Sequence, residues 1–388
     1  EGGYCVFAAD NGQTRSSLGR DVITLAEPGE YQAPAGVSWF FSGAEGMIGL
    51  TAAPLYRGDC RYSWEFYDGG AVWTCQRGGL TARTGLALAR LGSGELRRAE
   101  LHWDGEGVLE GELLCYLEPV LCGERDHLAH PAFSKLFVES RAIPGGVSFR
   151  RRPRGAEEHP VLAALWDGEG STFTTSRQAA LGRGGLRALA GGGPGPLKGE
   201  TGAVLDPCLM VRLPVRLRPG ESCALRLALG VSDRLDAAAD TAQRLLEGRE
   251  EPGGMLAPIA QRLGLDQVQA LGAFALLRHL ASVRPGAEGR PPQCELWQFG
   301  ISGDLPIAAA PLEGGVGEDK IGLWCAQHRF LTRAGWPFDL VFLAEEGGDY
   351  RRPLLTAVRE ALRALGAESA LGARGGGHLV DHGEGFPT

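Results

Sequence analysis

The stretch 296–307 (LWQFGISGDLPI) carries side chains whose chemistry suits a sugar. Trp297 offers an indole face, Gln298 an amide and Asp304 a carboxylate, and a binding site needs a few such polar groups beside an apolar surface. The two glycines of the stretch allow backbone angles that side chains resist, and its proline favours an extended chain just before a strand. The alternative is structural, with Asp304 capping its own turn and Trp297 closing a core.

A second group of acidic residues, Glu345, Glu346 and Asp349, follows an unbroken apolar segment that is typical of a buried strand. Ligands of α/β folds usually bind at the carboxyl ends of strands, so these carboxylates could do acid–base work. The alternative is a solvated loop at the entry to the next helix, with Asp349 as its cap. The solvated loop is the simpler of the two alternatives.

Metal and cofactor sites are not predicted. His127 and His130 suit a metal only if their segment is helical and a carboxylate completes the set, and Pro131 argues against a continuing helix. The basic run 150–154 could hold an anion, but acidic residues follow it directly, which favours a solvated turn. No phosphate loop, dinucleotide fingerprint or His-Glu-x-x-His motif is present, so we expect no cofactor.

Composition narrows the class of protein. The chain has 388 residues, a net charge of -8 and scattered basic residues, which argues against a nucleic-acid surface. No apolar run of about 18 residues exists, so we expect no membrane span. The nine cysteines form no Cys-x-x-Cys pair and lie mostly inside apolar segments, which suits a reducing compartment and predicts a cytoplasmic location. The chain starts at Glu1 without a signal peptide, so it is either processed or a piece of a longer protein.

Period-two patterns predict a large antiparallel β-sandwich over residues 1–231. The clearest is 211–218, where valine and leucine alternate with Arg212, Pro214, Arg216 and Arg218. Because proline lacks an N–H donor, we expect this strand at a sheet edge. The segment WDGEG at 103–107 recurs at 166–170, which predicts two similar hairpins because Asp-Gly favours tight turns.

After residue 231 the pattern of apolar residues changes from that of strands to that of helices. Residues 232–292 predict a helical connector with helices over 233–246 and 266–283. Residues 293–388 predict a small α/β subdomain in which strands and helices alternate, an order that favours parallel pairing. Its expected strands are 305–309, 338–343 and 377–380, and its expected helices are 319–333 and 352–365. The fold class is therefore mainly β, followed by a connector and a small α/β unit.

Aromatic residues at the ends of the sandwich strands could form a platform on which sugars stack. Most of them are expected in the core, since large aromatics dominate sandwich interiors. They are Trp39, Phe40, Trp64, Trp73, Trp103 and Trp166.

Several stretches together resemble the glycosyltransferase 36 / glycoside hydrolase 94 group. They occur in the order 130–138 (HPAFSKLFV), 151–154 (RRPR), 181–184 (LGRG), 202–207 (GAVLDP), 300–307 (GISGDLPI) and 338–343 (FDLVFL). Within the group, the match is best to cyclic β-1,2-glucan synthases and 1,2-β-oligoglucan phosphorylases. Each motif is modest, but their order and combination over residues 60–350 are specific.

The resemblance implies a β-sandwich that leads through a helical connector towards an (α/α)6 barrel. Such enzymes form or cleave β-glucosidic bonds, and the phosphorylases use phosphate as the attacking group with one carboxylic acid as proton donor. The general acid of the family lies in an Asp-Trp-Asn-Asp-like motif of the barrel, which this sequence lacks. No catalytic residue is therefore carried over, and the chain resembles the amino-terminal, non-catalytic portion.

Three hypotheses follow. The first is a fragment of a β-1,2-glucan phosphorylase or synthase whose sandwich packs on a catalytic barrel or on a homodimer partner, which predicts an exposed apolar patch. The second is a free-standing module that binds β-glucan or gluco-oligosaccharide, which predicts an exposed aromatic strip. The third is an independent glycoside hydrolase that uses two of Glu345, Glu346 and Asp349. A sugar site, if present, is expected at Trp297, Gln298 and Asp304.

Overall fold

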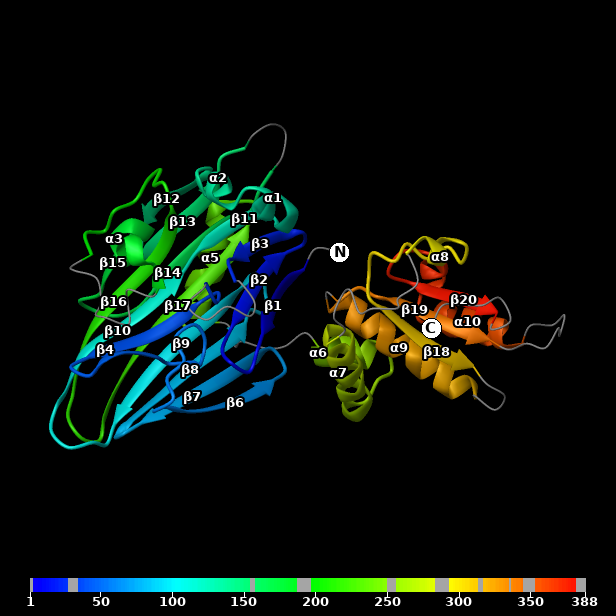
Figure 1. Ribbon diagram of the computed structural model, residues 1–388, viewed down its shortest axis with the longest axis horizontal. Helices are drawn as coiled ribbons and strands as arrows, with labels where there is room; N and C mark the ends of the chain where they lie inside the picture. Colours follow the sequence, from blue (N-terminus) through cyan, green and yellow to red (C-terminus); the bar gives the residue numbers. More distant parts are fainter. Residues whose placement is uncertain are drawn as a thin grey trace. The chain divides into compact units, whose positions relative to one another are not determined.

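The computed structural model describes residues 3–26, 34–153, 158–186, 197–249, 256–282, 293–312, 317–334, 336–344 and 353–381. The chain forms two compact units, Glu1–Gly254 and Met255–Thr388. Figure 1 shows a first unit built mainly of strands and a second unit that combines helices with a small sheet. The boundary between the units falls inside the segment 232–292.

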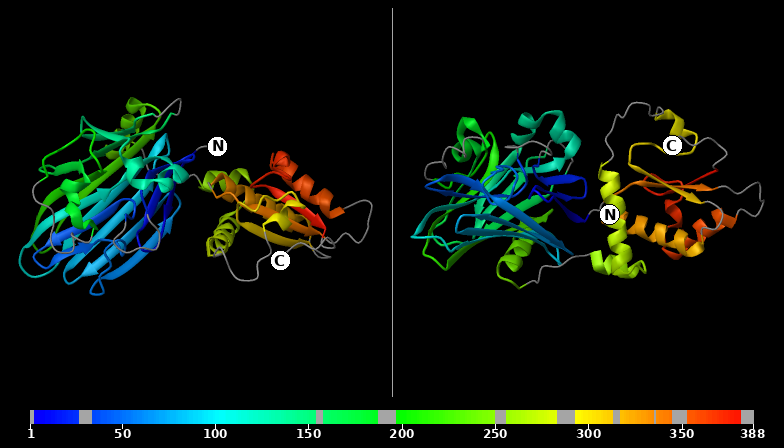
Figure 2. Two further views of the ribbon diagram at one scale, coloured as in Figure 1. Left: turned by 45° about the horizontal axis from the view of Figure 1, so that its top comes forward. Right: turned by 60° about the horizontal axis from the view of Figure 1, so that its bottom comes forward.

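The first unit is an antiparallel β-sandwich, as the alternating patterns predict (Figures 1 and 2). Its largest sheet has the order β12 (Val138–Ile143), β13 (Gly146–Arg151), β14 (Val161–Trp166), β17 (Glu221–Ser232), β9 (Ser93–Trp103), β8 (Leu80–Leu88), β7 (Gly70–Arg77) and β6 (Arg61–Tyr67). A second sheet has the order β15 (Thr172–Ser176), β16 (Pro207–Leu217), β10 (Leu109–Leu117), β4 (Ser38–Gly43) and β5 (Gly46–Gly49). A third has the order β1 (Tyr4–Ala8), β2 (Thr14–Leu18), β3 (Asp21–Thr24) and β11 (Pro119–Gly123).

The main core lies between the two larger sheets. Val211, Val215 and Leu217 of β16 are buried together with Leu225 and Leu227 of β17, and these residues belong to one apolar cluster. Alternate residues of each strand therefore point into the core, as a half-buried sheet requires.

The two WDGEG segments are not hairpins, so that prediction is wrong. The segment 103–107 begins with the last residue of β9 in the eight-stranded sheet and ends before β10 of the five-stranded sheet. The segment 166–170 likewise begins with the last residue of β14 and ends before β15. The indole of Trp103 donates to the carbonyl of Gly107 at 3.1 Å, and that of Trp166 donates to Ser171 Oγ at 3.1 Å. Both segments are corners at which the chain changes sheets.

The expected edge position of the Pro214 strand is also wrong, because β16 lies between β15 and β10. The pairing with β15 extends only to Arg212, which lies opposite Thr172, whereas the pairing with β10 continues past Pro214, which lies opposite Glu112. Pro214 thus has a paired strand on one side alone, a setting in which a missing N–H is tolerated.

Short helices and one longer helix complete the first unit. The short elements are α1 (Glu124–Ala129), α2 (Pro131–Lys135), α3 (Arg177–Leu181) and η1 (Gly182–Gly184). The longer helix, α5 (Leu235–Leu246), packs on β17, β14 and β9 of the eight-stranded sheet. Gly230 allows this close approach, because a Cβ there would lie 1.9 Å from the carbonyl oxygen of Ala238.

The second unit is a small α/β unit with a parallel sheet, as its alternating pattern predicts. Strands β18 (Ile307–Leu312), β19 (Asp339–Ala344) and β20 (Gly377–Asp381) pair in parallel in that order. The helices are α6 (Leu256–Arg262), α7 (Gln267–Ser282), α8 (Cys294–Trp297), α9 (Glu318–Arg333) and α10 (Pro353–Ala364), with η2 (Glu368–Ala370). Side chains of α7, α9 and α10 share one apolar core with the sheet, with Phe330 and Phe342 fully buried.

Candidate functional site

The three residues predicted to hold a sugar lie on one surface loop of the second unit. Trp297 ends the short helix α8 and is 63% exposed, so the alternative that it closes a core is wrong. Gln298 is exposed, and its amide Nε2 donates to the carbonyl of Glu295 at 3.1 Å. Asp304 is exposed as well and lies beyond the two positive-φ glycines of the loop.

The loop is held by polar contacts of its own and by an apolar anchor. Gln293 Nε2 donates to the carbonyl of Ser302 at 2.7 Å and to Asp304 Oδ1 at 3.3 Å. Ile301 is fully buried in a small cluster with Val341 of the central strand β19. The loop therefore turns Ile301 inward and leaves the indole of Trp297 in solvent.

The other sequence candidates do not form a site in the described residues. Glu345, Glu346 and Asp349 lie outside those residues. His127 is buried in α1, and burial lowers the pKa of its imidazole. Within the described ranges, no group of three His, Cys, Asp or Glu side chains could hold a metal ion.

The basic run 150–154 is tied to the backbone of α2 as far as the structure describes it. Arg151 is buried, and its Nη1 donates to the carbonyl of Ser134 at 3.0 Å. Arg152 Nη2 donates to the carbonyl of Leu136 at 2.8 Å, and both guanidinium groups lie over the ring of Phe137. These two arginines thus satisfy carbonyls at the end of α2, a structural role that the sequence did not indicate.

A buried cluster of charged residues lies beside α2, and sequence reasoning missed it. The fully buried Glu118 accepts from Lys135 Nζ at 2.7 Å, from Arg177 Nε at 3.1 Å and from the hydroxyl of Tyr116 at 2.7 Å. Asp206 completes the cluster at 3.0 Å from Lys135 Nζ and 3.5 Å from Arg177 Nη1. Two cations face two carboxylates, so the charges balance.

The charges of the cluster shift the pKa values of Lys135 and Tyr116. Burial alone would lower the pKa of Lys135, but Glu118 and Asp206 raise it above its ordinary value. Burial and the neighbouring Glu118 raise the pKa of the Tyr116 hydroxyl, which therefore stays protonated as a donor. Each carboxylate of the cluster already contacts Lys135 and Arg177, so the cluster has a structural role in joining its segments.

Two of the six stretches that carry the family resemblance contribute a residue to this cluster, and a third begins shortly after another of its residues. Lys135 comes from the stretch 130–138, Asp206 from 202–207, and Arg177 begins the helix that leads into 181–184. The only sequence signal was that Lys135 and Asp206 are charged residues inside these motifs; Glu118 and Arg177 lie outside them.

The stretches 130–138 and 202–207, together with the helix α1 before them, expose apolar side chains. Phe133 is 47% exposed, Leu128 and Leu136 are also exposed, and Leu205 is 82% exposed directly before the cluster residue Asp206. These four side chains are termed the α2 patch, namely Leu128, Phe133, Leu136 and Leu205. Phe133 is supported by an edge-to-face contact with Phe137 at 5.2 Å.

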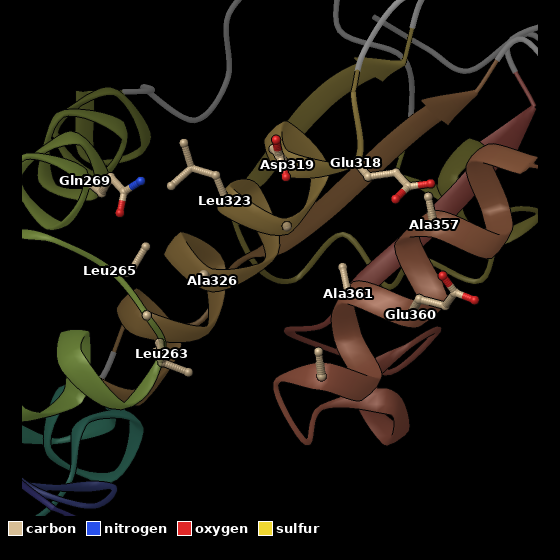
Figure 3. Close-up of a pocket in the computed structure, with 13 residues that line it drawn as sticks. Leu263, Leu265, Gln269, Glu318, Asp319, Leu323, Ala326, Ala357, Glu360 and Ala361 are labelled. Atoms are coloured by element: carbon tan, nitrogen blue, oxygen red, sulfur yellow. The ribbon is translucent and has the colours of Figure 1, made fainter.

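A cavity of about 520 Å³ lies in the second unit between α9 and α10, with the segment before α7 on a third side (Figure 3). Glu318 and Asp319 occupy the first turn of α9, where the helix dipole favours negative charge, and Glu360 lies on α10. The described residues that line the cavity include these three acidic side chains and no basic one. The cavity therefore suits a neutral or cationic molecule.

No helix in the described ranges combines the length and the apolar character that crossing a membrane requires.

Comparison with known proteins connects these features to one family. Residues 45–247 match the family model of the glycosyl hydrolase 94 supersandwich domain. Over 330 residues the chain is 28% identical to the cyclic β-(1,2)-glucan synthase NdvB of Rhizobium meliloti (strain 1021). That alignment covers 78% of this chain but only 12% of the relative, so the chain spans a small part of the relative's length.

Among solved structures, a bacterial glucoamylase complexed with acarbose shares 10% identity at a TM-score of 0.37, covering 64% of this chain and 36% of that chain. A human-microbiome protein described as a kojibiose phosphorylase shares 6% identity at a TM-score of 0.33, covering 63% of this chain and 28% of that chain. Both TM-scores are too low to carry an argument. The family model, in contrast, spans more than half of the chain, and the chain therefore belongs to the glycosyl hydrolase 94 family through its supersandwich domain.

Proposed function

We propose that this chain is the non-catalytic, amino-terminal region of a longer β-1,2-glucan phosphorylase or cyclic β-1,2-glucan synthase-like enzyme. The α2 patch is the surface that docks on the catalytic barrel of that enzyme. The observation that carries the proposal is the exposure of Phe133 and Leu136 within the stretch 130–138. The side chains between them, Ser134 and Lys135, instead contact the buried Cys122 and Glu118.

The physical reason is the contrast between the two sides of this stretch. Ion pairs and hydrogen bonds of Lys135 fix its backbone, so the apolar side chains are presented in a defined arrangement. Exposed apolar patches with polar surroundings are typical of protein interfaces. Burying a single leucine or phenylalanine side chain contributes about 1.5–3 kcal/mol, so four such residues supply a useful part of a binding energy.

The absence of independent catalysis is part of the proposal. The sequence lacks the general-acid motif of the family, and the buried carboxylates of Glu118 and Asp206 are engaged by cations. The proton donor would then come from the barrel. A second copy of the chain is the alternative occupant of the α2 patch, and a cytoplasmic location suits the buried thiols of Cys115 and Cys208, whose pKa values burial raises.

A second candidate function is glucan contact at Trp297, Gln298 and Asp304. It is favoured by the exposure of Trp297 on a loop whose backbone is held by Gln293 and Ile301. An exposed indole that is not needed for the core is available to stack on a sugar ring, and the amide and carboxylate can bind hydroxyl groups.

The test of the docking proposal measures association of this chain with a separately purified barrel region of a family 94 enzyme by sedimentation velocity. We expect association that the double substitution Phe133→Ser, Leu136→Ser weakens at least tenfold. Leu91→Ser is the control, because Leu91 is an apolar side chain that is 66% exposed but follows β8, outside the patch. Turnover of β-1,2-gluco-oligosaccharides by the chain alone, or an equal effect of the control, contradicts the proposal.

A further inference from the structure

The edge strand β6 carries a row of aromatic side chains on one face. Tyr62, Trp64 and Phe66 alternate along the strand and lie opposite Cys75, Trp73 and Ala71 of β7. Those three β7 residues are buried, so the row belongs to the core-facing side of the sheet. Nevertheless Trp64 is 51% exposed and Phe66 is 48% exposed.

Trp64 and Phe66 are exposed because the apolar cover of the sheet on this strand extends only to the partly buried Tyr62. Val6 and Ala8 of β1 pack against the cluster that contains Trp73, and the indole of Trp73 donates to the carbonyl of Ala9 at 2.9 Å. Phe66 meets Trp73 edge to face at 6.2 Å. The buried tryptophan therefore supports the first exposed ring from behind and limits its freedom to move.

Tyr56 extends the row at its other end. Its side chain is exposed, and its ring centroid lies 5.9 Å from that of Tyr62. The Tyr62 hydroxyl donates to the carbonyl of Gly49 at 3.3 Å, which fixes this ring. Alternate residues of a strand are about 6.6 Å apart, so the four rings, termed the β6 row (Tyr56, Tyr62, Trp64 and Phe66), form an elongated platform.

The charges near the row neutralise one another. Arg57 binds Asp59 through two nitrogens at 3.0 Å, and Arg77 binds the same carboxylate at 2.8 Å. Arg77 also contacts Glu45 at 3.0 Å. A ligand of this platform therefore meets aromatic faces and paired ions, which favours a neutral molecule with flat apolar faces and a hydroxylated rim.

We propose that the β6 row binds a neutral chain of pyranose sugars, with successive sugar rings stacked on Trp64, Phe66 and the two tyrosines. A pyranose ring has an apolar C–H face and polar edges, which matches aromatic rings that are open on one side. That the sugar is a β-linked glucan rests on the proposed function, whereas the stacking platform does not.

A second copy of the chain, pairing with the open edge of β6, is the competing occupant. Arg61 and Glu65 are exposed on this strand, and charged residues at a sheet edge oppose strand pairing between molecules. The row is also aromatic throughout, with no aliphatic member, unlike the leucine-rich α2 patch. Both observations favour a sugar over a second strand.

The test is calorimetric titration of the full chain with linear β-1,2-gluco-oligosaccharides, with β-1,4- and β-1,3-linked oligosaccharides as comparators. We expect Trp64→Ala to weaken binding about tenfold or more, which corresponds to the loss of one aromatic stacking contact of about 1.4 kcal/mol. Trp64→Phe keeps an aromatic face and should retain most of the affinity. If a β-1,4- or β-1,3-linked oligosaccharide binds in place of the β-1,2 chain, and Trp64→Ala weakens that binding to the same extent, the β6 row is supported as the site and the linkage of the sugar is corrected.

Tyr67→Ala is the matched control, because Tyr67 is aromatic, 49% exposed and on the same strand, but points to the opposite face. Thermal unfolding of each variant separates lost binding from lost folding. The proposal is overturned if the wild-type chain binds no oligosaccharide, or if Tyr67→Ala weakens binding as much as Trp64→Ala. It is also overturned if only Trp297→Ala abolishes binding, or if sedimentation shows a dimer that Trp64→Ala disrupts. None of these results bears on docking through the α2 patch.

Discussion

The carboxylate of Glu118 lies 2.7 Å from the ammonium group of Lys135, and this fully buried glutamate joins the end of β10 to the end of α2. Glu118 follows β10 directly in the chain, and Lys135 is the last residue of α2. Arg177 and Asp206 close the network around this pair. The contact therefore connects the sandwich core to the stretch that presents the α2 patch.

Removing Glu118 should destabilise the first unit. Glu118→Ala leaves the partly buried Lys135 and Arg177 with one carboxylate between them and leaves the buried Tyr116 hydroxyl without its acceptor. Breaking such a buried pair typically costs about 3–5 kcal/mol, so we expect a loss of that order in urea unfolding. The control is Glu110→Ala, which removes an exposed pair with Arg216 and should cost about 0–1 kcal/mol. Equal losses for both variants would show that the cluster has no special role.

A second buried polar group lies at the start of the parallel sheet. Asp339 Oδ1 accepts from the backbone N–H of Gly375 at 2.6 Å and lies 3.3 Å from His378 Nε2, and both side chains are buried. Asp339→Ala leaves the Gly375 N–H and the His378 ring without this partner and should lower the stability of the second unit by about 1–3 kcal/mol. Hydrogen exchange of β19 and β20 peptides measures the effect. Asp304→Ala, which changes an exposed aspartate of the same unit, should leave that exchange unchanged.

Acidic pH should weaken the second unit through His328. Burial lowers the pKa of this imidazole below its ordinary value of 6.5, while the Phe338 carbonyl and Asp339 oppose the shift and Arg329 and His378 add to it. The unfolded chain thus binds the proton more readily, so stability rises with pH. This contribution is complete above about pH 6.5 and is lost as the pH falls through the lower pKa of the folded state.

The measurement is hydrogen exchange of α9 and β19 between pH 7.5 and 5.5, corrected for intrinsic exchange. His328→Gln keeps an Nε2 donor for the Phe338 carbonyl and should reduce the pH dependence. His127→Asn removes a buried histidine of the first unit and should leave the response of the second unit unchanged. An unaltered pH dependence in His328→Gln would assign the effect to another group.

The sandwich could be predicted because its signal is local. Val211, Val215 and Leu217 alternate with polar residues, and a period of two determines which face of a strand is buried wherever the strand lies. The parallel sheet of the second unit could be predicted from another local signal. Its strands and helices alternate along the chain, and this order leaves little choice of connection.

The corners and the charged cluster could not be predicted for the opposite reason. The Asp-Gly pair after Trp103 specifies a tight turn, but the sheet that the next strand joins depends on packing between distant segments. Glu118, Lys135, Arg177 and Asp206 are far apart in the chain, and no periodicity connects them. The exposure of Trp297 also follows from tertiary structure, because Ile301 and not the indole reaches the core.

Substituting Trp297 separates its two possible roles. Because the indole is 63% exposed, Trp297→Ala should change the free energy of unfolding by no more than about 0.5 kcal/mol. If the loop contacts glucan, the same substitution should weaken gluco-oligosaccharide binding severalfold. Ile301→Ala is the contrasting variant, since it removes a buried anchor of the loop and should cost about 2–5 kcal/mol. A large stability loss in Trp297→Ala would contradict the exposed position.

Gly230→Ala tests the packing of α5 on the eight-stranded sheet. A Cβ at this position would lie 1.9 Å from the carbonyl oxygen of Ala238 and 2.9 Å from the backbone nitrogen of Ala242, so the helix must move away. The displaced helix would expose Ala242 and Leu245, which are now buried against the sheet. Overpacking of this kind costs typically about 1–3 kcal/mol, which urea unfolding can measure. Gly85→Ala, in β8 of the same sheet, meets no atom closer than 4.0 Å and should be tolerated, so a comparable loss there would place the effect in the strand backbone and not in helix packing.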